Sequence, residues 1–381
     1  MSSFNVDSEK YVAVVREAIK ELGSIMDFSI KDWAKDLVKS AMGRSVRTKD
    51  PIFWPSGMLV LGLVEARRAL LEKLSGDEES QNLVSEIDAV IMKHLNLWKH
   101  KYGFKVEFID DALTGAALVK LYQQSYDEAI RSYCKEAADK IYEYLKAAPR
   151  DEKGTIVYNA EKSSNVFADG VGQVSLFLSA YGKTFEVEEA EELARLQIEN
   201  YMEYGMDEKT FLPYHGYCLT ESKAEKKGVL SWGRAAGWLI MGVSECASLP
   251  GTNDDNDDWD EDDRVRDPRQ DKMDEWYFKL SEALLEYQKS DGGYGWQVQA
   301  MEGPVDTSAT GMILYGLLNG GKCDGEEIHG SLQALERNIE DGKVKNALSA
   351  CDDFGVHYQT YGHYPWGQGA ALAALSVSIY K

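Results

Sequence analysis

The side chains best suited to chemistry are concentrated between residues 214 and 238. The segments YHGYCLTES (214–222) and SWGRAAGW (231–238) supply His215, Trp232, Arg234 and Trp238. A helix that opens with Trp-Gly-Arg places a guanidinium beside the positive end of the helix dipole, and both attract a carboxylate or a phosphate. The alternative is an arginine paired with a buried Asp or Glu. The two tryptophans are six residues apart, about 600° of helical rotation, so they do not share a face unless Trp232 precedes the first turn.

Carboxyl groups stand at the start of two other apolar segments. Asp169 lies in NVFADGVGQVSLFL (165–178), between apolar residues and a glycine. Burial favours the protonated form of a carboxyl group, which can then act as a general acid near neutral pH. Asp110 and Asp111 open the preceding apolar segment, and two carboxyl groups from neighbouring hairpins suit acid–base work on a sugar. The sequence leaves open which of Asp110 and Asp111 faces inward, and helix capping is the simpler role for any one of these aspartates.

Aromatic residues near three further segments could contact a sugar. SDGGYGWQVQ (290–299) predicts a tight turn and a short hairpin at the rim of a site, where Trp296 would be available. YGHYPWGQGAAL (361–372) offers His363 and Trp366 in a similar way, and FWPSGMLVLGL offers Trp54. Packing in the core is an equally good interpretation of each. Because no cluster has the spacing of metal ligands, we expect neither a metal nor another cofactor.

Most of these side chains share a position, because their segments are predicted to begin apolar helices that contain glycine. Six such starts recur at intervals of 56–74 residues, at Trp54, Asp110, Asp169, Trp232, Asp306 and Trp366. Charged segments between them have the i, i+3, i+4, i+7 spacing of amphipathic helices, as at 65–74, 126–148, 186–204 and 271–289. This alternation predicts an all-α fold, a single (α/α)6 barrel over residues 1–381, with the buried helices inside and their starts at one mouth.

The longest interval contains an acidic run, TNDDNDDWDEDDRVRDPR (252–269). Its composition is typical of a solvated insertion loop. Aspartates at alternate positions resemble a calcium loop, but the glycine and the terminal glutamate of an EF-hand are missing.

The overall composition excludes several classes of partner. The chain has 381 residues and a formal charge of -22, which argues against binding to nucleic acid or to an anionic membrane surface. The five cysteines have no CxxC or zinc spacing, so we expect reduced thiols in a cytoplasmic protein. We find no signal-peptide pattern and no apolar run of membrane-spanning length. A monomer and a homodimer both remain open.

Several of these segments together resemble a known family. VFADGVGQVSLFL is similar to the Asp-Gly segment of the unsaturated glucuronyl and rhamnogalacturonyl hydrolases, which are glycoside hydrolase families 88 and 105. SWGRAAGW resembles their Trp-Gly-Arg-(small)-x-Gly-Trp block, and HGYCLTES resembles the His segment just upstream. FWPSGMLVLGL, DTSATGMILYGL and GQGAALAAL also resemble their counterparts. The resemblance extends from about residue 20 to residue 381.

The resemblance implies an (α/α)6 barrel and a particular reaction on an unsaturated oligosaccharide. Polysaccharide lyases leave a 4,5-unsaturated uronic acid at the non-reducing end of their products, and these enzymes remove it by hydration of the double bond. Asp169 would be the general acid and base, and Asp110 is favoured over Asp111 as the second carboxylate. His215 and Arg234 match substrate-contact positions, and Trp232 and Trp238 match an aromatic wall.

Two departures from the family pattern lie beside this site. Gln173 stands where the family often has Met, and Leu176 stands where Pro is common. We therefore expect Gln173 to contact the substrate and to alter substrate preference. Two alternatives are kept: an (α/α)6 sugar epimerase or ordinary glycosidase, which would process saturated sugars, and a carbohydrate binder without catalysis.

Overall fold

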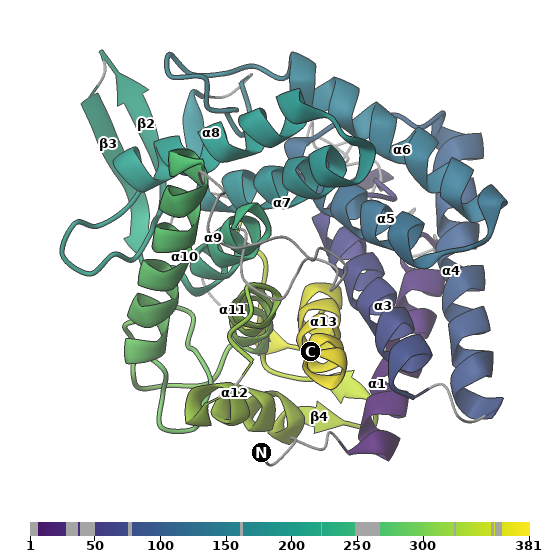
Figure 1. Cartoon of the computed structure of the whole chain (residues 1–381). Helices are drawn as coiled ribbons and strands as arrows, with labels where there is room; N and C mark the ends of the chain where they lie inside the picture. Colours follow the sequence, from purple (N-terminus) through teal and green to yellow (C-terminus); the bar gives the residue numbers. More distant parts are fainter. Residues whose placement is uncertain are drawn as a thin grey trace, which may run out of the picture.

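Twelve α-helices make up most of the part of the chain that the structure describes. The computed structural model describes residues 7–27, 37–38, 50–74, 78–160, 163–221, 223–247, 267–323, 325–351, 354 and 360–381. Along the chain the helices alternate between an outer and an inner ring (Figure 1).

The inner ring consists of α3 (Trp54–Glu72), α5 (Ala112–Gln124), α7 (Ala168–Phe185), α9 (Gly233–Cys246), α11 (Thr307–Asn319) and α13 (Pro365–Tyr380). Each packs against the next, and α13 packs against α3, so the ring closes. The outer ring consists of α1 (Ser8–Ser24), α4 (Glu78–Tyr102), α6 (Glu128–Ala147), α8 (Glu188–Tyr204), α10 (Pro268–Glu286) and α12 (Glu326–Arg337). The predicted (α/α)6 fold is confirmed.

Burial follows the difference in sequence pattern between the two rings. In α11 every residue from Thr307 to Leu318 is buried, whereas α12 buries only five of its residues, on one face. An apolar stripe on an otherwise charged helix can be satisfied by one neighbour, but a helix that is apolar all round needs neighbours on every side. The inner position is therefore the one that satisfies the six glycine-containing helices.

One predicted outer helix is wrong. Residues 65–74 were expected to form an amphipathic outer helix, but nearly all of them continue the inner helix α3. Its charged residues are neutralised inside the protein: Arg67 Nε donates to Asp88 Oδ1 at 2.7 Å, and Glu65 accepts the hydroxyl groups of Tyr315 and Tyr380 at 2.8 and 2.7 Å. A charged residue in a sequence indicates a solvent-exposed position only when no buried partner is available to neutralise it.

Short strands complete the described fold. β1 (Asn165–Phe167), β2 (Tyr214–Thr220) and β3 (Lys223–Leu230) form an antiparallel sheet in the order β1-β2-β3, at the edge of the ring (Figure 1). The register shifts between Tyr214 and Gly216, which places a bulge at His215. β4 (Ile339–Glu340) pairs with β5 (Lys343–Val344), and β6 (Ala347–Leu348) pairs with β7 (Tyr361–Gly362). These strands were not among the elements predicted from the sequence.

The segment 290–299 does not form the predicted hairpin. A turn closes at Gly292, whose φ is +83° and whose N–H donates to the Lys289 carbonyl at 2.8 Å. The chain then forms an isolated bridge between Gln297 and Trp232. Residues 290–299 therefore pair with Trp232, the residue before α9, and not with a second strand within the same segment.

Most of the acidic segment 252–269 lies outside the described residues. Its last three residues are described and contain the start of α10. Asp267 caps that helix by accepting from the Arg269 N–H at 2.9 Å. Within the described ranges, no helix is both long enough and apolar enough to cross a membrane.

Glycines allow the inner helices to approach closely, and this predicts the effect of an added methyl group. A Cβ at Gly369 would lie 2.3 Å from the Met58 carbonyl oxygen on α3. Gly369→Ala should therefore lower the free energy of unfolding by about 1–3 kcal/mol, although alanine normally favours a helix. Thermal and urea unfolding would measure it.

The control is Gly23→Ala on the outer helix α1, where the nearest atom to an added Cβ is a Val90 methyl carbon at 3.7 Å. This variant should be as stable as the parent or slightly more stable. Equal stability of the two alanine variants would contradict the role assigned to Gly369.

Candidate active site

A cavity lies at the end of the barrel where the inner helices begin. Ten residues line it: Trp54, Asp110, Tyr158, Asp169, Gln173, His215, Trp232, Arg234, Trp238 and Cys351. Eight of these were singled out from the sequence, whereas Tyr158 and Cys351 were not. The space open to water-sized molecules is about 50 Å³.

The inner helices place these side chains through their first turns. Trp54 is the first residue of α3, Asp169 the second residue of α7 and Arg234 the second residue of α9. Asp110 lies in a short 3-10 turn, Ile109–Asp111, directly before α5. Because the positive ends of these helix dipoles converge on the cavity, it is suited to an anionic group.

Asp110 is held by two donors within the cavity wall. The Tyr158 hydroxyl donates to Asp110 Oδ2 at 2.5 Å, and the Gln173 amide Nε2 donates to Oδ1 at 3.4 Å. The aspartate is only 2% exposed. Both oxygens of this carboxyl group therefore accept a hydrogen bond from the cavity wall.

Asp169 has a different environment, dominated by His215. His215 Nε2 lies 3.4 Å from Asp169 Oδ2, and that oxygen accepts no hydrogen bond from any described residue. The imidazole is fixed by ring contacts: it stacks on Trp232 at 5.6 Å and meets Phe167 and Phe354 edge-on, both at 5.3 Å. A buried oxygen without a donor is available to bind or to protonate a ligand.

Arg234 combines both interpretations drawn from the sequence. It lines the cavity, but its Nη1 and Nη2 also donate to the carbonyls of Leu348 and Ser349, both at 2.9 Å. Its Nη1 lies 3.9 Å from Asp306 Oδ2, a fully buried carboxylate that also accepts the Leu348 N–H through Oδ1. The arginine therefore carries a positive charge into the cavity wall and fastens the segment that leads to Cys351.

Trp232 and Trp238 both line the cavity, although they are six residues apart. Trp232 is the N-cap of α9 and has non-helical backbone angles, so helical rotation does not separate the two rings. Trp54 contacts Trp238 edge-on at 6.5 Å between ring centroids. These three rings form an apolar wall of the kind that packs against the face of a sugar.

Asp111, Trp296 and Trp366 are not among the residues that line this cavity. Asp111 is fully buried, and its Oδ2 accepts the backbone N–H groups of Glu107 and Phe108 at 3.0 and 3.2 Å. Burial raises the pKa of Asp111, and the nearby Asp50 adds to the effect. Asp110 therefore faces the cavity, while Asp111 folds the turn before α5.

The two tryptophans support the cavity from behind. The Trp366 indole N–H donates to the Leu348 carbonyl at 2.9 Å, and its ring stacks on Tyr364 at 4.6 Å. Trp296 packs edge-on against Trp232 at 6.0 Å. Trp296 therefore contacts a residue that lines the cavity, and Trp366 contacts the segment that Arg234 fastens.

His363 also lies outside the cavity lining, where it joins α1 to the short strands. Its Nδ1 is hydrogen-bonded to the Val344 carbonyl at 2.9 Å, and its Nε2 forms an ion pair with Glu21. The hydrogen bond to Glu21 raises the pKa of His363, and burial opposes this in part. Glu17, Glu21 and His363 could together hold a metal ion, but Lys20 already pairs with Glu17 at 2.9 Å.

The two residues that the sequence analysis missed come from loops without a recognisable motif. Tyr158 precedes β1 and is separated from Asp110 by 48 residues, so no local spacing connects them. Cys351 follows β6. The only local signal was the abundance of tyrosine, which does not distinguish one tyrosine from another.

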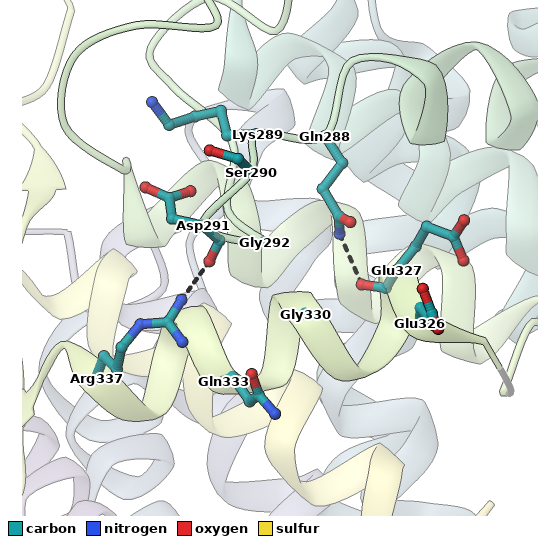
Figure 2. A pocket seen from close by; sticks show the side chains of 10 residues that line it. All are labelled: Gln288, Lys289, Ser290, Asp291, Gly292, Glu326, Glu327, Gly330, Gln333 and Arg337. Carbon is teal, nitrogen blue, oxygen red and sulfur yellow. Dashed lines mark hydrogen bonds between the residues drawn. The ribbon is translucent and has the colours of Figure 1, made fainter.

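A larger cavity elsewhere is a poorer candidate. It measures about 470 Å³ and lies between the end of α10 and the outer helix α12 (Figure 2). None of its lining residues belongs to an inner helix, and its polar groups satisfy one another: Arg337 donates to the Asp291 carbonyl, and Gln288 Nε2 donates to the Glu327 carbonyl at 2.6 Å. The small cavity at the helix starts is therefore the candidate active site.

A barrel of six helical hairpins with two carboxyl groups in one cavity at the helix starts defines a protein of the six-hairpin glycosidase class. The chain belongs to glycosyl hydrolase family 88, whose model matches residues 29–379, and it is therefore a glycoside hydrolase. No curated protein sequence matches it.

Solved structures with similar folds cover nearly the whole chain. A possible member of the GH105 family from Klebsiella pneumoniae is 18% identical with a TM-score of 0.72, over 100% of this chain and 95% of that one. An unsaturated glucuronyl hydrolase specific for heparin is 14% identical with a TM-score of 0.67, over 98% and 95%. The unsaturated glucuronyl hydrolase from Bacillus sp. GL1 is 15% identical with a TM-score of 0.62, over 96% and 94%.

The His363–Glu21 pair predicts a pH-dependent stability. A histidine whose pKa is raised on folding stabilises the protein fully below its unfolded value of about 6.5, and the effect is lost as the pH rises through the folded value. His363→Gln should therefore lower the free energy of unfolding at pH 6 by up to about 1 kcal/mol, with a smaller loss at pH 9. Urea unfolding at the two pH values would measure it, with the exposed His100→Gln as the control. An equal loss at both values would contradict the assignment.

Proposed function

We propose that this glycoside hydrolase removes a 4,5-unsaturated uronic acid from the non-reducing end of oligosaccharides produced by polysaccharide lyases. The observation that carries the proposal is the pair of unlike carboxyl groups in one cavity: Asp110 with two donors and Asp169 with a histidine neighbour. Hydration of a C=C bond requires one group that gives a proton and then takes one from water.

In this reaction Asp169 carries the proton, and Asp110 is the second catalytic carboxylate. Asp169 gives its proton to C4, and water adds at C5 while its proton passes to the Asp169 carboxylate. The hemiketal formed at C5 opens, which leaves a hemiacetal at C1, and that group breaks down with release of the next sugar. One water molecule is consumed, and Asp169 ends in the protonated form in which it began.

The remaining residues of the cavity have roles in binding. Arg234 and the helix starts favour the uronate carboxylate, because both present positive charge. Trp54, Trp232 and Trp238 provide the apolar wall for the ring. His215 is fixed by its aromatic neighbours with Nε2 3.4 Å from Asp169 Oδ2, where it can contact the substrate beside the catalytic carboxyl group.

The position of the cavity supports removal of one terminal residue. It is lined by residues at the starts of several inner helices, so it suits a chain end better than the middle of a polymer. About 50 Å³ holds only a few water molecules, so side chains at the rim have to move when a sugar ring enters. Two of the similar structures are described as unsaturated glucuronyl hydrolases, one specific for heparin and one responsible for the degradation of glycosaminoglycan. We propose glucuronyl, galacturonyl and rhamnogalacturonan products as the substrates to test.

Location and assembly are also proposals. We propose a cytoplasmic protein, supported by five cysteines that form no disulfide. A monomer or a homodimer is expected, and light scattering after size-exclusion chromatography would distinguish them.

The proposed role of Asp169 predicts a large loss of activity when its carboxyl group is replaced by an amide, which cannot donate and take back the proton. Asp169→Asn should reduce kcat by at least about 10²-fold and leave the unfolding transition close to that of the parent. The measurement is the loss of ultraviolet absorbance of the double bond in lyase-produced disaccharides. Asp271→Asn on the exposed side of α10 is the matched control and should keep full activity.

If the parent protein leaves the absorbance of all three substrate types unchanged, the proposed function is wrong. Turnover of saturated sugars instead would favour an epimerase or an ordinary glycosidase. Tight binding without turnover in calorimetry would favour a binder.

A further inference from the structure

Gln173 has one half of its amide group bonded and the other half unpaired. It lies on α7, four residues after Asp169 and therefore on the same face of the helix, one turn further in. Its Nε2 donates to Asp110 Oδ1, and the residue is only 2% exposed. Its Oε1 is buried and has no hydrogen-bond partner among the described residues, and Gln173 lines the cavity.

The orientation of this amide is set by Asp110. Asp110 Oδ1 is an acceptor here, so it takes the NH2 end of the amide beside it. The Tyr158 hydroxyl donates to the other oxygen, Oδ2, so both Asp110 oxygens act as acceptors. The reversed amide would bring Oε1 against Asp110 Oδ1, two acceptors with no proton between them. Tyr158 and Asp110 together therefore turn Gln173 Oε1 away as a free acceptor.

A buried acceptor at a cavity wall is costly unless a donor reaches it. The ligand group that satisfies Gln173 Oε1 must therefore be a hydroxyl or an N–H, and the uronate carboxylate is repelled by both Oε1 and the neighbouring Asp110. Other charged and titratable groups around Asp110 complete this environment: Asp111, Tyr144, Tyr158, Asp169, His215 and Arg234. Only Arg234 among them is a permanent cation.

We propose that Gln173 is a specificity-determining residue that accepts a hydrogen bond from a ring hydroxyl of the terminal sugar, at C2 or C3. The inference rests on the proposed function, because that function defines the sugar. Lyase cleavage removes the oxygen at C4, the C6 position is the carboxylate, and C1 carries the glycosidic bond. Free hydroxyl groups of an unsaturated uronic acid therefore remain only at C2 and C3.

The consequence is selection against substrates whose hydroxyl at that position is blocked. A methyl ether removes the donor without adding charge, so it leaves Oε1 unpaired. Sites built to hydrogen-bond a hydroxyl reject analogues that lack it more strongly than apolar sites reject an extra group. A methionine at position 173 has nearly the same volume but no acceptor, and it would lose this selection.

The experiment compares three unsaturated disaccharides: unmodified, 2-O-methyl and 3-O-methyl on the unsaturated ring. In the parent protein one of the two ethers should lower kcat/KM by about 10-fold or more. Gln173→Met should lower kcat/KM for the unmodified substrate by a similar factor and should show little further loss with that same ether. The other ether gives the steric effect of a methyl group alone.

Gln197→Met is the matched control. Gln197 is also fully buried, but its Oε1 accepts the Ile156 N–H at 2.8 Å and its Nε2 donates to the Leu193 carbonyl at 3.3 Å. This variant should be less stable, yet its selection among the three substrates should match that of the parent. If Gln173→Met does not fold, Gln173→Leu gives the same comparison.

The possible outcomes separate the two proposals. Suppose that the parent turns over the unmodified substrate, and that both ethers lower kcat/KM equally in the parent and in Gln173→Met. This result would overturn the role of Gln173 and leave the proposed function standing. No turnover of any of the three substrates by the parent overturns the proposed function and this inference with it. Loss of selection in Gln173→Met alone supports both.

Discussion

The close packing of six inner helices around one axis is the constraint on which the rest of this structure depends. At several points backbone meets backbone: a Cβ at Gly62 would lie 2.6 Å from the Gly369 carbonyl oxygen, and one at Gly172 would lie 2.1 Å from the Trp238 carbonyl oxygen. Only glycine permits such contacts. Because the inner helices run in the same direction, closing the ring brings their starts together, and the cavity lies among the starts of α3, α5, α7 and α9.

The two ends of the barrel use polar groups in opposite ways. At the end away from the cavity, Lys120 lies 3.6 Å from both Glu65 and Glu245, and Glu65 also accepts hydroxyl groups from Tyr315 and Tyr380. Burial alone would lower the pKa of Lys120, but Glu245 and Glu65 more than compensate and raise it. These groups satisfy one another. In the cavity, by contrast, Asp169 Oδ2 and Gln173 Oε1 are buried without a donor from the described residues. These two unsatisfied atoms lie beside each other in the cavity wall, where a bound ligand could supply the missing donors.

Within the cavity, the two carboxyl groups differ in their surroundings and therefore in their proposed roles. Asp110 accepts two hydrogen bonds and thereby orients Tyr158 and Gln173, whereas Asp169 has the imidazole of His215 nearby. Arg234 is anchored to the carbonyls of Leu348 and Ser349, so its charge stays at a fixed place in the wall. The rigid ring and these local hydrogen bonds together define where a proton, a carboxylate and a hydroxyl group of a sugar would lie.

The sequence by itself determined the helical class, the six-fold repeat and most of the cavity, because these depend on local signals. Glycine and an Asp or Trp recur at each inner helix start, and periodicity separates buried helices from amphipathic ones. It did not determine the fate of residues 65–74, since the partners that neutralise Glu65 come from α11 and α13. Nor could it separate Asp110 from Asp111, because the two are adjacent. Asp111 accepts backbone N–H groups of the turn before α5, whereas Asp110 accepts the hydroxyl of Tyr158, 48 positions away. Tertiary structure decided these points because each depends on a contact between distant segments, and such contacts leave no spacing along the chain.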